Sequence, residues 1–409
     1  MKRIVLFALG AMMAFGADAQ EKTNKFNWYG FIRNYAALDT RESVAGTEDF
    51  FLYVPKDVNM SGETDLNQVT SFRYAALTSR LGVNVTGYEF GGWKFGGKIE
   101  ADFYAGLNGS TGVATLRLRQ AFATMEKGAV SMKFGQAWHP MAADISDVIS
   151  LNAGAPFGPF SRTPQATFDF ALGSGFSLTA SALWQMQYVS AGPKGASADY
   201  IKYGCVPEFY LGANYKDQNF LARVGLDVTT ISPSRVGNKK DMLTTLSPFV
   251  YAQYKKGMFT FKGKTILAQA GEHMNLNGGY ALTDIKSDGS KVYTPTRNSS
   301  SWVCFSYGKK WQGIFFAGYV QNFGTKEKVY NADVENIYFS KNSFSNMNSM
   351  WRVSPTVAYN LGKMTFALEY EMTGIRYGEW GQEDFYALAT KNLHNVTNHR
   401  VQLMIKYTF

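Results

Sequence analysis

Apolar and polar side chains alternate with a period of two along much of the chain, most regularly at its C-terminus. Over the last ten positions Val401, Leu403, Ile405, Tyr407 and Phe409 alternate with Arg400, Gln402, Met404, Lys406 and Thr408. Successive side chains point to opposite faces of an extended strand, whereas a helix would spread such a pattern around all of its sides. The alternation therefore predicts strands with one apolar and one polar face.

The same pattern recurs in segments of about ten residues or more, which is long enough to cross a bilayer at a tilt. Strands of soluble sheets are usually about five or six residues long. Soluble sandwiches also alternate, but short turns on one side and long loops on the other are typical of outer-membrane barrels. We predict an all-β fold, a transmembrane antiparallel β-barrel of about sixteen strands, with roughly fourteen or eighteen as alternatives. Residues 244–255 and 313–323 alternate least regularly among the predicted strands.

The N-terminus has the pattern of a signal peptide. Two basic residues at 2–3 precede an apolar run at 4–16, and residues 17–19 read Ala-Asp-Ala, a small-residue cleavage pattern. The apolar run is too short to span a bilayer as a helix. We therefore predict a cleaved signal peptide at residues 1–19, export to the bacterial outer membrane, and a single barrel domain at residues 20–409.

The amino-acid composition excludes several other classes of protein. Charged residues make up 18% of the chain and aromatic residues 15%, which excludes a disordered chain. Cys205 and Cys304 are the only cysteines, which excludes a disulfide-stapled scaffold. The formal net charge is +9, but the basic residues are spread over the predicted strands rather than clustered. We therefore predict no nucleic-acid partner.

Three local features of the sequence distinguish one class of membrane barrel from others. The first predicted strand contains Trp-Tyr-Gly-Phe-Ile-Arg at residues 28–33, the chain ends on Phe409, and the predicted fifth strand is followed by a loop at 139–163 that is rich in Ala, Gly and Pro. With this layout the chain resembles the sixteen-stranded, usually trimeric, outer-membrane porins. Residues 134–138, Phe-Gly-Gln-Ala-Trp, resemble the DcaP-like subgroup, whose members are associated with uptake of small anionic solutes. Only a few residues separate the predicted cleavage site from the first strand, too few for that subgroup's periplasmic coiled-coil extension.

The resemblance implies a passive channel. In porins the third external loop folds into the barrel, so residues 139–163 would narrow the pore. Phe409 would be the assembly signal read during insertion. The partners implied are outer-membrane lipid, lipopolysaccharide, small hydrophilic solutes and two further copies of the chain in a homotrimer.

The inward parity of the predicted strands carries many charges. The predicted pore-lining residues are the basic Arg33, Arg80, Arg117, Arg119, Lys133, Arg400 and Lys406, the acidic Glu100, Asp102, Glu369 and Glu371, and Asp144 and Asp147 in the constriction loop. Basic wall residues facing acidic loop residues would set a transverse field, and rings of Arg and Lys favour anions. The alternative is that the charges only solvate the lumen, with Glu100 or Asp102 neutralising a neighbouring arginine. We predict passive diffusion of small hydrophilic solutes with a mild anion preference.

Catalytic motifs are scarce. The four histidines, His139, His273, His394 and His399, form no close metal-binding spacing, and neither a nucleophile elbow nor a phosphate-binding loop occurs. We predict no enzyme activity, no metal and no cofactor. Two alternatives stay open: a hydrolase on a barrel scaffold, and a channel selective for one small acid or sugar. Inward aromatic residues would favour the selective channel: Tyr29, Phe31, Tyr35 and Tyr104. The long polar loops near 40–70, 272–300 and 324–349 are expected to face the external medium.

Overall fold

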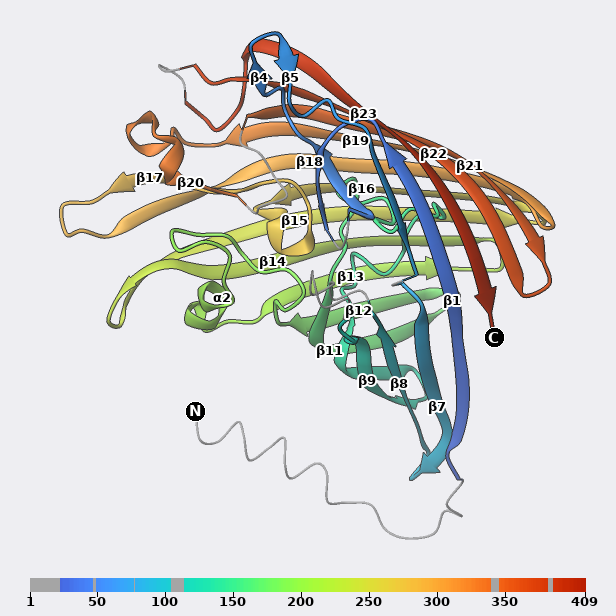
Figure 1. Ribbon diagram of the computed structural model, residues 1–409. Coiled ribbons are helices and arrows are strands. Elements are labelled where there is room, and N and C mark those ends of the chain that lie inside the picture. The colour runs from blue at the N-terminus through green and yellow to red at the C-terminus, as the bar shows by residue number, and fades with distance from the viewer. Residues whose placement is uncertain (1–22, 47–48, 77, 104–113, 340–345, 382–384) are drawn as a thin grey trace.

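The strands form one antiparallel sheet that closes on itself as a sixteen-stranded barrel, which confirms the predicted fold class (Figure 1). The computed structural model describes residues 23–46, 49–76, 78–103, 114–339, 346–381 and 385–409. The predicted signal peptide and Tyr104 lie outside the described residues. No helix in the described part of the chain is long and apolar enough to cross a membrane.

The barrel strands follow one another around the sheet in chain order. They are β1 (Lys25–Asp39), β6 (Ser71–Ala75), β7 (Arg80–Phe90), β8 (Trp93–Asp102), β9 (Arg117–Lys127), β10 (Val130–Trp138), β11 (Arg162–Gly173), β12 (Phe176–Leu183), β13 (Glu208–Lys216), β14 (Phe220–Val236), β15 (Lys239–Lys256), β16 (Phe259–Gln269), β18 (Lys291–Gly308), β19 (Trp311–Thr325), β21 (Met347–Leu361), β22 (Met364–Glu379) and β23 (Lys391–Thr408). β6 and β7 both pair with β1 and act as two halves of one barrel strand.

Closure of the barrel joins the two ends of the chain. β1 pairs with β23 in a ladder that runs from Phe31 opposite Thr408 to Asp39 opposite Arg400. Beyond that ladder, Gly30 and Phe409 exchange two backbone hydrogen bonds, with N···O distances of 3.3 and 3.1 Å. The C-terminal residue thus belongs to the closing seam, and its role as an assembly signal remains a prediction.

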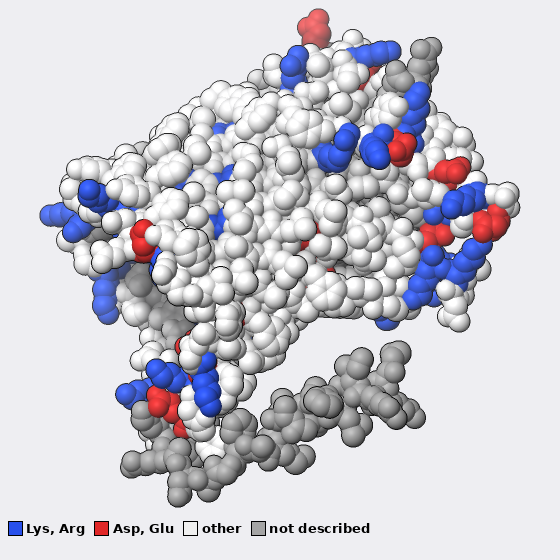
Figure 2. Space-filling view, turned by 180° about the vertical axis from the view of Figure 1, so that it is seen from behind, with Lys and Arg blue, Asp and Glu red and all other residues white. Residues whose placement is uncertain are grey.

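Exposure alternates along the strands as the sequence pattern predicts. On β23, Leu403 is 54% exposed and Ile405 46%, whereas the intervening Met404 is 5% exposed. On the face shown in Figure 2, most Lys, Arg, Asp and Glu side chains lie near the ends of the molecule and the band between them is largely uncharged. An apolar band on the outer face of a closed barrel is stable in hydrocarbon and unfavourable in water.

Shorter elements connect the long strands. They are β2 (Ser43–Gly46), β3 (Phe51–Pro55), β4 (Met60–Ser61), β5 (Thr64–Asp65), α2 (Asp199–Gly204), η2 (Gly271–Met274), β17 (Gly279–Ile285), η3 (Tyr330–Ala332), η4 (Val334–Asn336) and β20 (Ile337–Phe339). β17 and β20 pair with each other, and they lie with α2 at one end of the barrel (Figure 1).

The first long connection differs from the expectation that residues 40–70 face the medium. β3 is buried along its whole length and contacts β22 and β23. The Arg352 guanidinium on β21 donates to the carbonyl oxygen of Tyr53, and the Phe51 ring packs edge-on against Phe160 with 5.1 Å between ring centroids. An apolar run such as Phe-Leu-Tyr-Val-Pro is costly to leave in water, so it folds back against inward-facing side chains.

Substitution of Gly30 by Ala is expected to weaken the closing seam. A Cβ at this position would lie 2.5 Å from the Arg80 carbonyl oxygen and 2.6 Å from the Phe409 ring. Overpacking of this kind typically costs about 1–3 kcal/mol. The measurement is the temperature at which the fast-migrating folded band is lost on unboiled gels. Gly313→Ala is the matched control, because its Cβ would meet no atom within 4 Å. Equal stability of the two variants would contradict the prediction.

Candidate functional site

A charged cavity of about 350 Å³ lies within the barrel. Its wall is formed by inward side chains of the consecutive strands β19, β21, β22, β23, β1, β7, β8 and β9, and residues 145, 147–151 and 153 also line it. The charged side chains that line it are Arg33, Arg80, Arg117, Arg119, Lys406, Asp102 and Asp147. Among the described residues this is five basic groups against two acidic groups, a surplus of three positive charges.

Two acidic residues organise the basic wall. Glu100 accepts a hydrogen bond from Nε of Arg119 at 2.8 Å and from the Tyr29 hydroxyl at 2.8 Å. Asp102 accepts from Nη1 of Arg119 at 2.7 Å and from both Nε and Nη2 of Arg117 at 3.0 and 2.9 Å. Neutralisation of Arg117 and Arg119 by these acids is therefore present in the structure, and the carboxylates also fix the direction of the guanidinium groups.

Arg33 and Lys406 extend the basic wall along neighbouring strands. Arg33 lies opposite Lys406 in the β1–β23 ladder, and both line the cavity. Nε of Arg33 donates to the Thr78 hydroxyl at 2.9 Å. Its guanidinium carbon lies 4.8 Å from the Phe31 ring centroid and 4.9 Å from that of Tyr35. Basic and aromatic side chains are thus adjacent at this wall.

Two predicted pore-lining basic residues are placed away from this cavity. Arg400 is 1% exposed, because its guanidinium is held by Asp39 at 2.7 Å and donates to the carbonyl oxygen of Phe50. Lys133 lies on the same wall but its ammonium is 5.5 Å from the Phe122 ring centroid. Both side chains have the predicted inward parity, but neither is among the residues that line the cavity.

Residues 139–163 are anchored to the barrel at many points. Glu369 on β22 accepts hydrogen bonds from the backbone N–H groups of Ile149 at 2.9 Å and Ser150 at 3.1 Å. Glu371, also on β22, accepts from the side-chain amide of Asn152 at 3.1 Å. Two of the three predicted pore-lining glutamates, Glu369 and Glu371, therefore hold this segment in place.

Basic side chains of β16 and β21 supply further anchors. Nζ of Lys264 on β16 donates to the carbonyl oxygens of Met141 and Asp144 at 2.7 and 2.6 Å. On β21, Nη1 of Arg352 donates to the carbonyl oxygen of Ala155 at 2.8 Å. Anchors on β16, β21 and β22 together hold the segment from Met141 to Ala155.

The acidic residues of the segment are themselves paired. Nε of Arg223 on β14 lies 2.8 Å from Asp144, and Lys262 on β16 forms an ion pair with Asp147. Asp147 lines the cavity together with the basic wall, whereas Asp144 is not among its lining residues, and the predicted transverse field stays a prediction. A cation from β14 or β16 compensates each acid, so their contribution to a transverse field is reduced.

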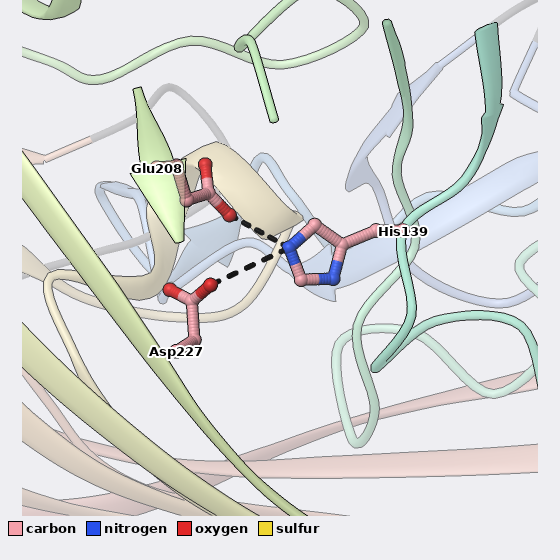
Figure 3. A group of neighbouring side chains, drawn as sticks. All are labelled: His139, Glu208 and Asp227. Carbon is pink, nitrogen blue, oxygen red and sulfur yellow. Dashed lines mark hydrogen bonds and ion pairs between the residues drawn. The ribbon is translucent and has the colours of Figure 1, made fainter. Parts of the chain in front are cut away.

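A second polar cluster lies at the start of the same segment (Figure 3). Nε2 of His139 is 2.6 Å from Glu208 on β13 and 3.6 Å from Asp227 on β14, and all three side chains are buried. His273 in η2 joins them, with its Nε2 3.6 Å from Glu208. Burial opposes charging of both imidazoles, but the two carboxylates outweigh it and raise the pKa of His139 and of His273 to about 9.

Sequence reasoning missed this cluster, because its members come from four separate segments and share no local spacing. His394 and His399, the two histidines nearest each other in the sequence, bind different partners. His394 contacts Asp57 at 2.7 Å, and His399 contacts the Tyr370 hydroxyl at 2.6 Å.

Comparison with known proteins supports the fold. No family model and no curated protein matches the sequence. The outer membrane channel DcaP of Acinetobacter baumannii is similar with a TM-score of 0.69 and 19% identity, covering 94% of this chain and 97% of that one. An anion-selective porin from Comamonas acidovorans has a TM-score of 0.56 and 11% identity, covering 95% and 100%. OmpF of Salmonella typhi in complex with daunomycin has a TM-score of 0.53 and 12% identity, covering 95% and 100%. The chain therefore has the fold of Gram-negative outer-membrane porins, as the resemblance predicted.

Removal of the Arg119 charge is expected to destabilise the barrel. Arg119→Gln leaves Glu100 and Asp102 buried with less compensation, and breaking a buried pair costs about 3–5 kcal/mol. The free energy of unfolding in urea, measured in lipid vesicles, reports the loss. Arg117→Gln is the matched control, because Arg117 is 24% exposed against 6% for Arg119 and water can replace its contact. A loss as large for Arg117→Gln would contradict the proposed importance of burial.

Proposed function

We propose that this protein is an outer-membrane porin that lets small hydrophilic solutes diffuse passively, with a mild preference for anions. One observation carries the proposal: a closed barrel with an apolar outer face encloses a cavity whose charged lining is mainly basic. Basic groups inside a water-filled pore attract anions and repel cations. One of the structurally similar channels is itself described as anion-selective, and the present proposal rests on this chain's own charges.

The proposal includes the setting of the channel. The barrel would lie in the outer membrane in contact with lipid and lipopolysaccharide, reached by export through a signal peptide at residues 1–19. A homotrimer is the proposed assembly, and Phe409 the proposed assembly signal. No enzymatic activity and no cofactor are needed for diffusion through a pore.

Residues 139–163 are the proposed constriction. The anchors from β14, β16, β21 and β22 come from inward-facing side chains, which supports a position of the segment across the lumen. Residues 145, 147–151 and 153 of this segment line the charged cavity together with the basic wall. Solute size would then be limited by the gap between this segment and β1, β7 and β9.

A channel selective for one small acid or sugar is the second candidate. It is favoured by the aromatic side chains beside the cavity: the Phe31 and Tyr35 rings flank the Arg33 guanidinium. Stacking surfaces beside a positive charge would retain a planar or ring-shaped anion longer than a simple ion. Saturation of the ion current by millimolar solute, rather than a linear rise, would favour this candidate.

The ion preference can be tested at the two basic residues that face each other across the seam. Arg33→Gln combined with Lys406→Gln should shift the zero-current potential of single channels towards cation selectivity. The shift should shrink as salt rises, because the screening length falls from about 10 Å at 0.1 M to about 3 Å at 1 M. Lys216→Gln with Lys256→Gln removes the same charge from exposed positions at strand ends and serves as the control. An unchanged potential in the test variant would mean that the basic wall does not set selectivity.

The size limit can be tested by shortening the anchored segment. Deletion of residues 142–158 removes the part held by Glu369, Lys264 and Arg352 and should raise single-channel conductance and the largest solute that permeates. Deletion of residues 286–289, the turn between β17 and β18, is the control and should leave both unchanged. If the longer deletion leaves conductance and size limit as they were, the segment does not narrow the pore.

A further inference from the structure

The cluster around His139 contains more negative charge and more acceptor capacity than the protein groups around it satisfy. Glu208 and Asp227 bring two carboxylates into a region where His139, Glu208, Asp227 and His273 are each at most 3% exposed. Oε2 of Glu208 and Oδ1 of Asp227 are buried and accept no hydrogen bond from the described residues. Each buried acceptor left without a donor costs about 1–3 kcal/mol.

Protonation of the two imidazoles balances the charge of the cluster but does not supply the missing hydrogen-bond donors. Two imidazolium groups would balance two carboxylates in charge. Even so, Oδ1 of Asp227 lies 3.6 Å from Nε2 of His139, beyond a normal hydrogen bond, and Oε2 of Glu208 still has no donor. A single divalent cation would carry the same two positive charges and would accept electron pairs from several of these atoms at once.

We propose that His139, Glu208 and Asp227 bind a divalent first-row transition-metal ion such as zinc, with His273 as the fourth ligand. One nitrogen or oxygen of each of His139, Glu208 and Asp227 lies within 4.8 Å of the others, so small side-chain shifts bring all three to about 2.0–2.2 Å from a common centre. Figure 3 shows the imidazole edge and the two carboxylates pointing toward one another. Imidazole with carboxylates is a donor set that suits zinc and its neighbours.

The surroundings supply the outer contacts that metal ligands need. The Thr229 hydroxyl donates to Oδ2 of Asp227 at 3.2 Å, which orients the carboxylate. Nδ1 of His273 faces the carbonyl oxygen of Ala270 at 3.1 Å, which leaves its Nε2 directed toward Glu208. A ring N–H fixed on a carbonyl oxygen sets the tautomer and the orientation of a ligating histidine.

Occupancy would be coupled to the anchored segment. The backbone N–H of Met141 contacts Nδ1 of His139 at 3.2 Å. This contact needs an unprotonated Nδ1, and a proton stands on Nδ1 both in the imidazolium and in an imidazole that holds a metal on Nε2. A metal at this site would therefore tie the first turn of residues 139–163 to β13 and β14 through its ligands. Metal binding at this site does not depend on the proposed diffusion of solutes through the barrel.

The experiment measures zinc on the full, untagged chain. The protein is refolded from urea into detergent micelles with zinc chloride, desalted, and analysed for bound metal, and affinity is measured by competition with a chromophoric chelator. We expect about one zinc per chain. Thr229→Val removes only the outer hydroxyl contact and preserves the shape of the side chain, so it should fold and should weaken zinc binding by about 10–100-fold.

Direct removal of ligands completes the test. His139→Gln with Asp227→Asn should abolish stoichiometric zinc, while His399→Gln, an exchange at a histidine outside the cluster, should retain it. If the double variant does not fold, Thr229→Val still decides the outcome. Wild-type protein without zinc above the level of the double variant, or unchanged affinity in Thr229→Val, would overturn the proposal in favour of a proton-balanced ion-pair cluster.

Discussion

Pairing of backbone amides is the constraint on which the rest of this structure depends. A strand with an apolar outer face can leave water only if every N–H and C=O along it has a partner, since hydrocarbon offers none. The β1–β23 ladder and the Gly30–Phe409 hydrogen bonds remove the two free edges that an open sheet would have. Closure then fixes the parity of every strand, because one face must meet lipid and the other the lumen.

Once the barrel is closed, its interior is too wide for the inward side chains to fill by themselves. β3 and residues 139–163 meet where Phe51 packs on Phe160, and inward-facing side chains of the barrel strands hold both segments. A backbone that enters the interior brings its own polar groups with it. Glu369, Lys264 and Arg352 satisfy those groups, so these inward charges serve as structural anchors.

The sequence predicted the strands and their faces well because a period of two is a local property. It predicted the lumen less well because contacts between distant segments leave no local pattern. The irregular segments 244–255 and 313–323 do form strands, β15 and β19, and their irregularity has a physical cause. Inward positions such as Phe249 and Phe316 are apolar because they belong to the core that includes Phe157 of the anchored segment. Where a strand faces packed chain rather than water, both of its faces are apolar and the alternation fades.

The same reasoning explains why several of the predicted inward charges are already paired with other protein groups. Glu369 and Glu371 bind the anchored segment, and Arg400 forms an ion pair with Asp39. Asp144 and Asp147 form ion pairs with basic residues of β14 and β16. The basic wall on β1, β7, β9 and β23 still carries more positive than negative groups after these pairings. Selectivity in a barrel of this kind is set by the charges that remain once the folded interior has satisfied its own backbone and buried carboxylates. Those charges can be identified only from the packing of the inner segments, because parity alone assigns a side chain to the lumen without saying what already occupies the space beside it.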